Sequence, residues 1–194
     1  MCRVLIIFLF ITSTFATEYK SGHCPNITAI SVDLIKAFGT WYEYSRSSNK
    51  WNNLEKCGYL QLNKPKDCSS ITIYNSISKE INEPLTMVTN FTVLNGRLDI
   101  TYNLPVVGKM VRELTIVDID YNDYVIGWLC IDVGSNHTES VWVLTREPNP
   151  SKNYNELAKS ALKSYGLKMP KMVRVDQKDC PYASSSNSSG VKTC

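Results

Sequence analysis

Residue types that perform catalysis are scarce in this chain of 194 residues. It has two histidines, His23 near the start and His137 within the triplet Asn136-His137-Thr138. Neither is placed like a catalytic base, and the Gly-x-Ser-x-Gly motif of serine hydrolases does not occur. Asp118 and Asp120 form an acid pair beside Tyr121, a pattern that is typical of a solvated turn. The sequence therefore favours a protein that is not an enzyme.

Cysteine is the reactive residue type that occurs repeatedly, at positions 2, 24, 57, 68, 130, 180 and 194. No Cys-x-x-Cys pair is present, so a zinc site is not predicted, nor any other metal site. Six cysteines remain if Cys2 is removed with a signal peptide, and an even number in a secreted chain indicates disulfides. Spacing alone does not choose their pairing. Cys68 or Cys194, if unpaired, could supply a reactive thiol.

The first residues have the composition of a secretory signal peptide, with Arg3, the apolar run VLIIFLFI and a small-residue end at Ala16. We expect residues 1–16 to be removed, residues 17–182 to form one domain, and the serine-rich residues 183–194 to be a disordered tail. The expected location is extracellular. No later apolar run reaches the ~20 residues of a membrane helix. Candidate glycosylation sites are Asn26, Asn90, Asn136 and Asn187.

Charge gives no reason to expect a nucleic-acid partner, since 20 basic and 18 acidic residues follow the predicted signal, a net charge of +2. Short segments rich in Ile, Val, Thr and Tyr recur along the chain, separated by turn residues such as Asn95-Gly96. They predict eight strands, at residues 41–46, 58–62, 70–76, 86–93, 97–103, 113–119, 124–131 and 141–145. Apolar residues at three- and four-residue steps predict a helix over 154–165, with a shorter helical turn before Gly39. This pattern favours an all-β barrel or sandwich.

Three motifs narrow the fold: GTWYEY at 39–44, TIVDIDYNDY at 115–124 and SVWVLTR at 140–146. Their order and spacing resemble the three signature regions of the lipocalin family. Further motifs at Cys24-Pro25, 56–58, 127–130, Asn149-Pro150 and 176–181 resemble the apolipoprotein D, Lazarillo and insect bilin-binding (insecticyanin) branch. The resemblance spans Cys24 to Pro181.

The resemblance implies an eight-stranded antiparallel up-and-down barrel with one C-terminal helix packed outside it. It implies a secreted carrier, monomeric or weakly dimeric, of a small hydrophobic ligand such as a fatty acid, sterol or bilin, with no required cofactor. It implies the disulfides Cys24–Cys130 and Cys57–Cys180, which leaves Cys68–Cys194 as a possible third. Gly39, Trp41 and Arg146 are expected to close the barrel floor. Residues expected to line the ligand cavity are Leu62, Asn75, Tyr102, Leu114, Trp142 and Leu144.

Several alternatives remain open from the sequence. Asn75 could orient a ligand carbonyl inside the barrel or be a surface amide beside a turn. An isomerase of the lipocalin type would need an inward thiol, for which Cys68 is the strand-flanking candidate. An amine-binding defensive or salivary lipocalin would need several cavity carboxylates, and Glu43 and Asp99 are the strand candidates.

Residues 103–111, NLPVVGKMV, are predicted to connect two strands near one end of the barrel. Leu104, Val106, Val107 and Met110 make this segment apolar, and exposed apolar clusters often mark contact sites. By the same resemblance, this loop would touch a membrane or lipid particle. The alternative is that its valines fold back over the barrel mouth.

Overall fold

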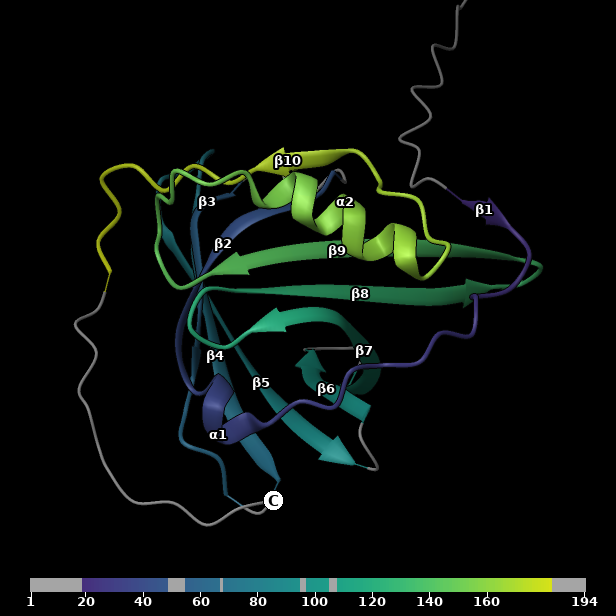
Figure 1. Cartoon of the computed structure of the whole chain (residues 1–194). Helices are drawn as coiled ribbons and strands as arrows, with labels where there is room; N and C mark the ends of the chain where they lie inside the picture. The colour runs from purple at the N-terminus through teal and green to yellow at the C-terminus, as the bar shows by residue number, and fades with distance from the viewer. Residues whose placement is uncertain (1–18, 49–54, 67, 95–96, 105–107, 183–194) are drawn as a thin grey trace, which may run out of the picture.

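Strands dominate the computed structural model, which describes residues 19–48, 55–66, 68–94, 97–104 and 108–182 (Figure 1). The predicted signal peptide and tail, with Asn187 and Cys194, lie outside the described residues, as do Val106 and Val107. The elements in chain order are β1 (Lys20–Ser21), α1 (Leu34–Ala37), β2 (Gly39–Ser47), β3 (Glu55–Leu62), β4 (Ser69–Ser78), β5 (Pro84–Leu94), β6 (Arg97–Leu104), β7 (Gly108–Asp120), β8 (Tyr124–Val133), β9 (Asn136–Thr145), α2 (Tyr154–Ser164) and β10 (Met172–Arg174).

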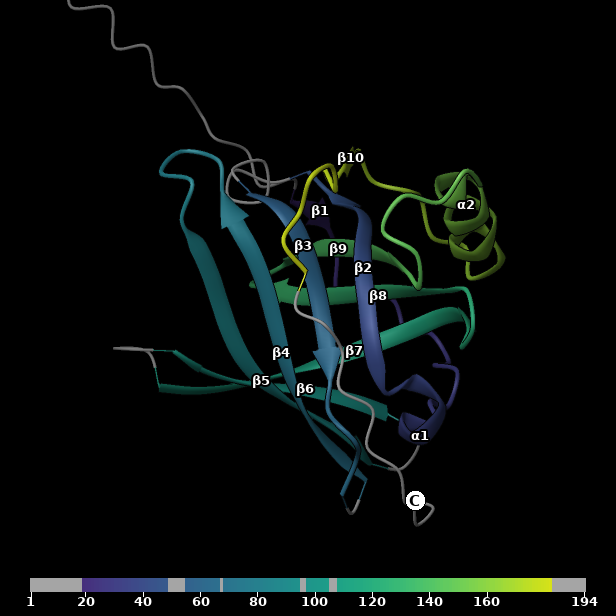
Figure 2. The ribbon, with the colours of Figure 1, turned by 90° about the vertical axis from the view of Figure 1, so that its left-hand side faces the viewer.

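Strands β2 to β9 form a closed antiparallel barrel. Each strand pairs with the next along the chain, and β9 pairs back onto β2, where Tyr42 lies opposite Thr145. Figure 2 shows β2 to β5 as neighbouring strands of one curved wall. The eight-stranded up-and-down barrel is confirmed. The strands run further than predicted at most ends, so that His137, which lies between the predicted strands 124–131 and 141–145, is part of β9.

Two short strands extend the sheet at its ends. β1 pairs with the start of β9, and β10 pairs with the last residues of β2. β10 lies within residues 169–175, a segment whose sequence is compatible with one further edge strand. β1 was not predicted, because two residues are too few to show an alternating pattern.

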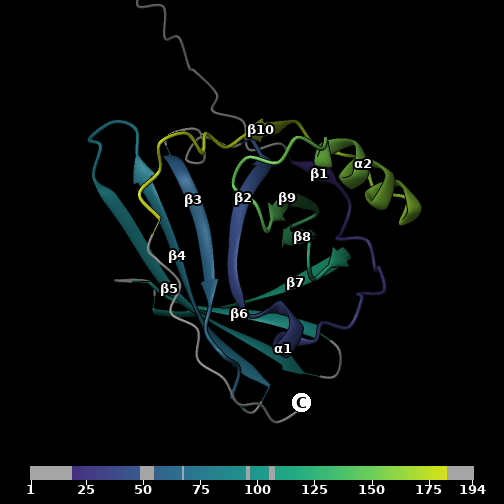
Figure 3. The same cartoon turned by 60° about the vertical axis from the view of Figure 1, so that its left-hand side comes forward.

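Alternation of side chains along the strands creates two apolar cores. One lines the barrel interior around Trp41, Leu98 and Ile116. The other lies outside, where α2 covers β8 and β9 with Ala158 and Leu162 (Figures 1 and 3). The helix begins as predicted, with the Asn153 side chain accepting from the backbone N–H of Asn155 at 3.1 Å, and it ends before Gly166, whose φ is +74°.

Both disulfides that the resemblance implies are present. Cys24–Cys130 ties the N-terminal arm to β8, and Cys57–Cys180 ties the C-terminal segment to β3. Cys68 is in neither of them, and its pairing with Cys194 stays a prediction because Cys194 is not described.

The segment 103–111 is mostly strand, contrary to the sequence-based prediction of a connecting loop. Leu104 ends β6 and pairs with Gly108, while Met110 lies within β7 opposite Tyr102. Antiparallel pairing of β6 with β7 continues to Leu104 opposite Gly108, past the predicted strand bounds at residues 103 and 113. Lipid contact by this hairpin stays a prediction.

Within the described ranges, no helix is long and apolar enough to cross a membrane. The same residues contain no group of three or more His, Cys, Asp or Glu side chains arranged to hold a metal ion.

Candidate functional site

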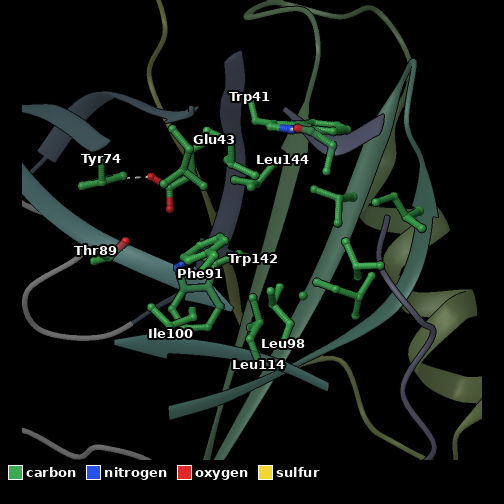
Figure 4. Close-up of a pocket in the computed structure, with 18 of the residues that line it drawn as sticks. Trp41, Glu43, Tyr74, Thr89, Phe91, Leu98, Ile100, Leu114, Trp142 and Leu144 are labelled. Atoms are coloured by element: carbon green, nitrogen blue, oxygen red, sulfur yellow. Dashed lines mark hydrogen bonds between the residues drawn. The ribbon is translucent and has the colours of Figure 1, made fainter. Parts of the chain in front are cut away.

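The barrel encloses a cavity of about 310 Å³ between its eight strands. Its walls are mainly aliphatic and aromatic, with Phe91, Leu98 and Ile100 contributed by β5 and β6 (Figure 4). These side chains point inward because they occupy alternate positions of their strands. A cavity of this kind binds small ligands by removing apolar surface from water.

Five of the six residues predicted to line the cavity do so: Leu62, Tyr102, Leu114, Trp142 and Leu144. They come from four strands of the barrel, β3, β6, β7 and β9. Trp142 and Leu144 occupy alternate positions of β9, with Arg146 two residues beyond. Whether these residues contact a ligand stays a prediction.

Asn75 does not line the cavity, and its prediction as an inward amide was wrong. In β4 the inward neighbour is Tyr74, so the next residue faces the outside of the barrel. The Asn75 carboxamide oxygen accepts a hydrogen bond from the Thr86 hydroxyl at 3.1 Å on the outer face. The sequence was misleading here because Asn75 lies on the same face of β4 as Ile71, and an isoleucine is expected to point inward. Ile71 is instead 55% exposed on the outer face.

The barrel floor has the predicted arrangement of Gly39, Trp41 and Arg146. The Arg146 guanidinium lies 3.6 Å from the centroid of the Trp41 ring and donates to the carbonyl oxygens of Thr40 and Tyr121, both at 2.9 Å. Burial lowers the pKa of Arg146 to about 10, so it stays charged at neutral pH. Gly39 has a φ of +100°, and a Cβ there would lie 3.4 Å from Arg146 Nη1.

One side of the otherwise apolar cavity carries a polar cluster, formed by Glu43, Arg46, Glu55 and Tyr74. Arg46 Nη1 lies 2.7 Å from Glu43 Oε2 and 3.7 Å from Glu55 Oε2. The Tyr74 hydroxyl oxygen lies 3.0 Å from Arg46 Nη1, 3.1 Å from Glu43 Oε2 and 2.9 Å from Glu55 Oε2. Figure 4 shows the Glu43–Tyr74 hydrogen bond beside the cavity.

A β-bulge in β2 brings this cluster together. The pairing of β2 with β9 shifts register between Glu43 and Ser45, so Glu43 and Arg46 both face the cavity although they are three residues apart. Regular alternation would have sent Arg46 outward, which is why sequence reasoning missed it. The amine-binding alternative had named Glu43, but not Glu55; Asp99, its other candidate, is not on the cavity wall.

Room for the buried carboxylate comes from Gly58 in β3. A Cβ at that position would lie 2.4 Å from Glu43 Oε2 and 3.0 Å from the Tyr74 hydroxyl. The buried Gln177 side chain completes the support, since its amide donates to the carbonyl oxygens of Glu43 at 2.9 Å and Gly58 at 2.7 Å. Gln177 thus bridges β2 and β3 where the two strands no longer pair, beyond Tyr42 and Tyr59.

Burial and mutual charge set the protonation of the cluster. Burial raises the pKa of Glu43, against the opposing effects of Arg46 and the Tyr74 hydrogen bond. For Arg46, burial alone would lower the pKa, but Glu43, Tyr74 and Glu55 together raise it. Burial and the neighbouring carboxylates also raise the pKa of Tyr74, which therefore stays neutral.

The other reactive groups singled out from the sequence lie away from the cavity. His137 is buried in β9, with Nδ1 2.7 Å from the carbonyl oxygen of Gly22, and helps to fix the N-terminal arm. Asp118 accepts a hydrogen bond from the Tyr124 hydroxyl at 2.9 Å. Cys68 is not on the cavity wall, so among the described residues no thiol is placed for the isomerase alternative.

The model of the lipocalin / cytosolic fatty-acid binding protein family matches residues 38–179. The chain belongs to the lipocalin family. Insecticyanin from the tobacco hornworm Manduca sexta is similar, with a TM-score of 0.71 and 17% identity over 83% of this chain and 89% of the hornworm chain. Lobster apocrustacyanin A1 has a TM-score of 0.66 and 18% identity, over 87% of this chain and 94% of its own. The amine binding protein of Rhodnius prolixus, in its tryptamine complex, has a TM-score of 0.60 and 15% identity, over 79% and 86% of the two chains.

Proposed function

We propose that this protein is a secreted, non-catalytic carrier that holds one small hydrophobic molecule inside the barrel. The observation that supports it best is the cavity inside the barrel, whose walls are mainly apolar. Burying an apolar ligand there is favourable by roughly 25 cal/mol for each Å² removed from water. The family of the chain is consistent with binding rather than catalysis.

Secretion forms part of the proposal. The signal-like sequence of residues 1–16 supports it, and so do the two disulfides, because disulfides persist in oxidising compartments. A disulfide-bonded product in the medium of expressing eukaryotic cells would agree with this expectation. Retention of the chain inside the cells would contradict it.

Intrinsic tryptophan fluorescence tests the carrier function directly. Trp142 and Trp41 both line the cavity, so a ligand that enters should change their emission. We expect saturable quenching by at least one member of a panel of fatty acids, fatty alcohols, sterols, retinol and biliverdin. The variant Trp142→Phe should show a smaller response to the same ligand, because Trp41 alone then reports from the cavity wall. No response to any ligand, by fluorescence or by calorimetry, would overturn the proposal.

A further inference from the structure

The polar cluster gives the cavity a chemical preference that its apolar walls do not have. Glu43 and Arg46 are almost fully buried, with side chains 2% and 3% exposed, and Glu55 is 25% exposed. With all three groups ionised, two carboxylates face one guanidinium, a net charge of −1. A buried net charge is costly unless a counter-charge or a proton compensates it.

The hydrogen-bond geometry shows where compensation is missing. A phenol has one proton to donate, yet the Tyr74 hydroxyl lies within hydrogen-bond distance of both Glu43 Oε2 and Glu55 Oε2. Arg46 donates to the same hydroxyl and occupies one of its acceptor positions. When both carboxyl groups are ionised, one of them therefore faces the phenol oxygen without a proton between them. An additional positive donor would relieve this contact.

Acceptors for such a donor are present. The contacts that the two carboxylates make with Arg46 and Tyr74 all use their Oε2 atoms. Both glutamates line the cavity. A ligand ammonium group can donate up to three hydrogen bonds and carries the missing charge.

We infer that the cavity prefers a ligand with an apolar body and a protonated amine, whose ammonium group binds between Glu43 and Glu55 beside Tyr74. This inference rests on the carrier function proposed above and names the ligand class for the same cavity. A ligand carboxylate is disfavoured, because it would face two carboxylates, and the guanidinium between them already contacts both. A hydroxyl group is intermediate, since it supplies one donor and no charge.

Three ligands that share one alkyl chain separate these cases: decylamine, decanol and decanoate, measured by tryptophan fluorescence and calorimetry at neutral pH. We expect decylamine to bind about tenfold more tightly than decanol, and decanoate to bind most weakly. Glu55→Gln should weaken decylamine by about tenfold and change decanol by less than about twofold. Glu43→Gln should act in the same direction.

The outcomes distinguish this inference from the carrier function itself. Glu156→Gln is the matched control, because Glu156 is on the outer surface of α2 with its side chain 70% exposed. Binding of decanol without a preference for decylamine would overturn the amine inference and leave the carrier function standing. Equal losses for decylamine and decanol in Glu55→Gln would also overturn it. If none of the three ligands or the wider panel binds, the carrier function fails. Should Glu43→Gln not fold, the partly exposed Glu55 decides the question.

Discussion

The face of the strand on which a residue lies determines whether its side chain lines the cavity. Trp142 and Trp128 lie on adjacent strands of the barrel, yet the first lines the cavity and the second packs outside with α2. Gly127, paired with Trp142, also faces the cavity and would place a Cβ 3.3 Å from Leu114. Residue choice at these positions therefore sets the shape of the apolar space.

Truncation of the inward tryptophan should weaken ligand binding without unfolding the barrel. We expect Trp142→Ala to weaken the binding of an apolar ligand by about 1–3 kcal/mol, because buried apolar contact is lost. Calorimetric titration with decanol measures this. Ile71→Ala on the outer face is the control, since Ile71 is 55% exposed and touches no ligand space. Equal affinities for wild type and Trp142→Ala would place the ligand elsewhere.

The inward set of residues was partly predictable from sequence and partly not. Leu62, Tyr102, Leu114, Trp142 and Leu144 follow regular alternation in well-marked strands, so their inward orientation could be anticipated. Arg46 could not, because the bulge between Glu43 and Ser45 has no local sequence signal such as glycine. Asn75 failed for a related reason, since the isoleucines of β4 face outward against the usual rule.

At the scale of elements, the outer helix is held by its first turn. Tyr154 packs edge-on against Tyr44 of β2 at 5.3 Å, and its hydroxyl donates to Asp123 in the turn between β7 and β8. The Nζ atom of Lys152 forms an ion pair with the same carboxylate, 3.1 Å from Asp123 Oδ2. The helix itself was predictable from its apolar periodicity, whereas this anchor joins residues 31 positions apart and has no sequence pattern.

The anchor should make stability depend on pH. The Tyr154 hydrogen bond, with help from Lys152, holds the pKa of Asp123 below its ordinary value. A depressed folded-state pKa contributes stability above the unfolded pKa, near about 4, and this contribution is lost as the pH falls through the folded pKa. Tyr154→Phe should therefore lower the free energy of unfolding at neutral pH by about 0.5–1 kcal/mol, a modest value because Asp123 is partly exposed.

Urea unfolding at neutral and strongly acidic pH tests this expectation. The difference between wild type and Tyr154→Phe should shrink in acid. Tyr165→Phe, near the other end of α2, is the control and should show no such pH dependence. A difference that persists unchanged in acid would show that the lost hydroxyl acts through something other than the ionised Asp123.

At the scale of the whole molecule, the barrel closes through its own strand pairing, and the disulfides fasten the chain ends to it. Cys24–Cys130 holds the N-terminal arm against β8. Cys57–Cys180 instead holds the C-terminal segment beside the cluster. That segment also donates from the Gln177 amide to Glu43 and Gly58, and it accepts from Cys57 N–H through the Asp176 carbonyl oxygen at 2.8 Å.

The two disulfides should thus have similar effects on stability and different effects on binding. Each links residues more than a hundred positions apart, with sequence separations of 106 and 123. Replacing either pair by alanine should cost about 2–4 kcal/mol of unfolding free energy. Only the double variant Cys57→Ala with Cys180→Ala should also reduce the preference for decylamine over decanol, because release of the C-terminal segment frees Gln177 and loosens the backbone of Glu43.

Each double variant is the control for the other. Unfolding is followed in urea, and binding is measured by calorimetry under conditions where both variants remain folded. If the preference for decylamine is unchanged in the Cys57 and Cys180 variant, the C-terminal segment does not position the cluster.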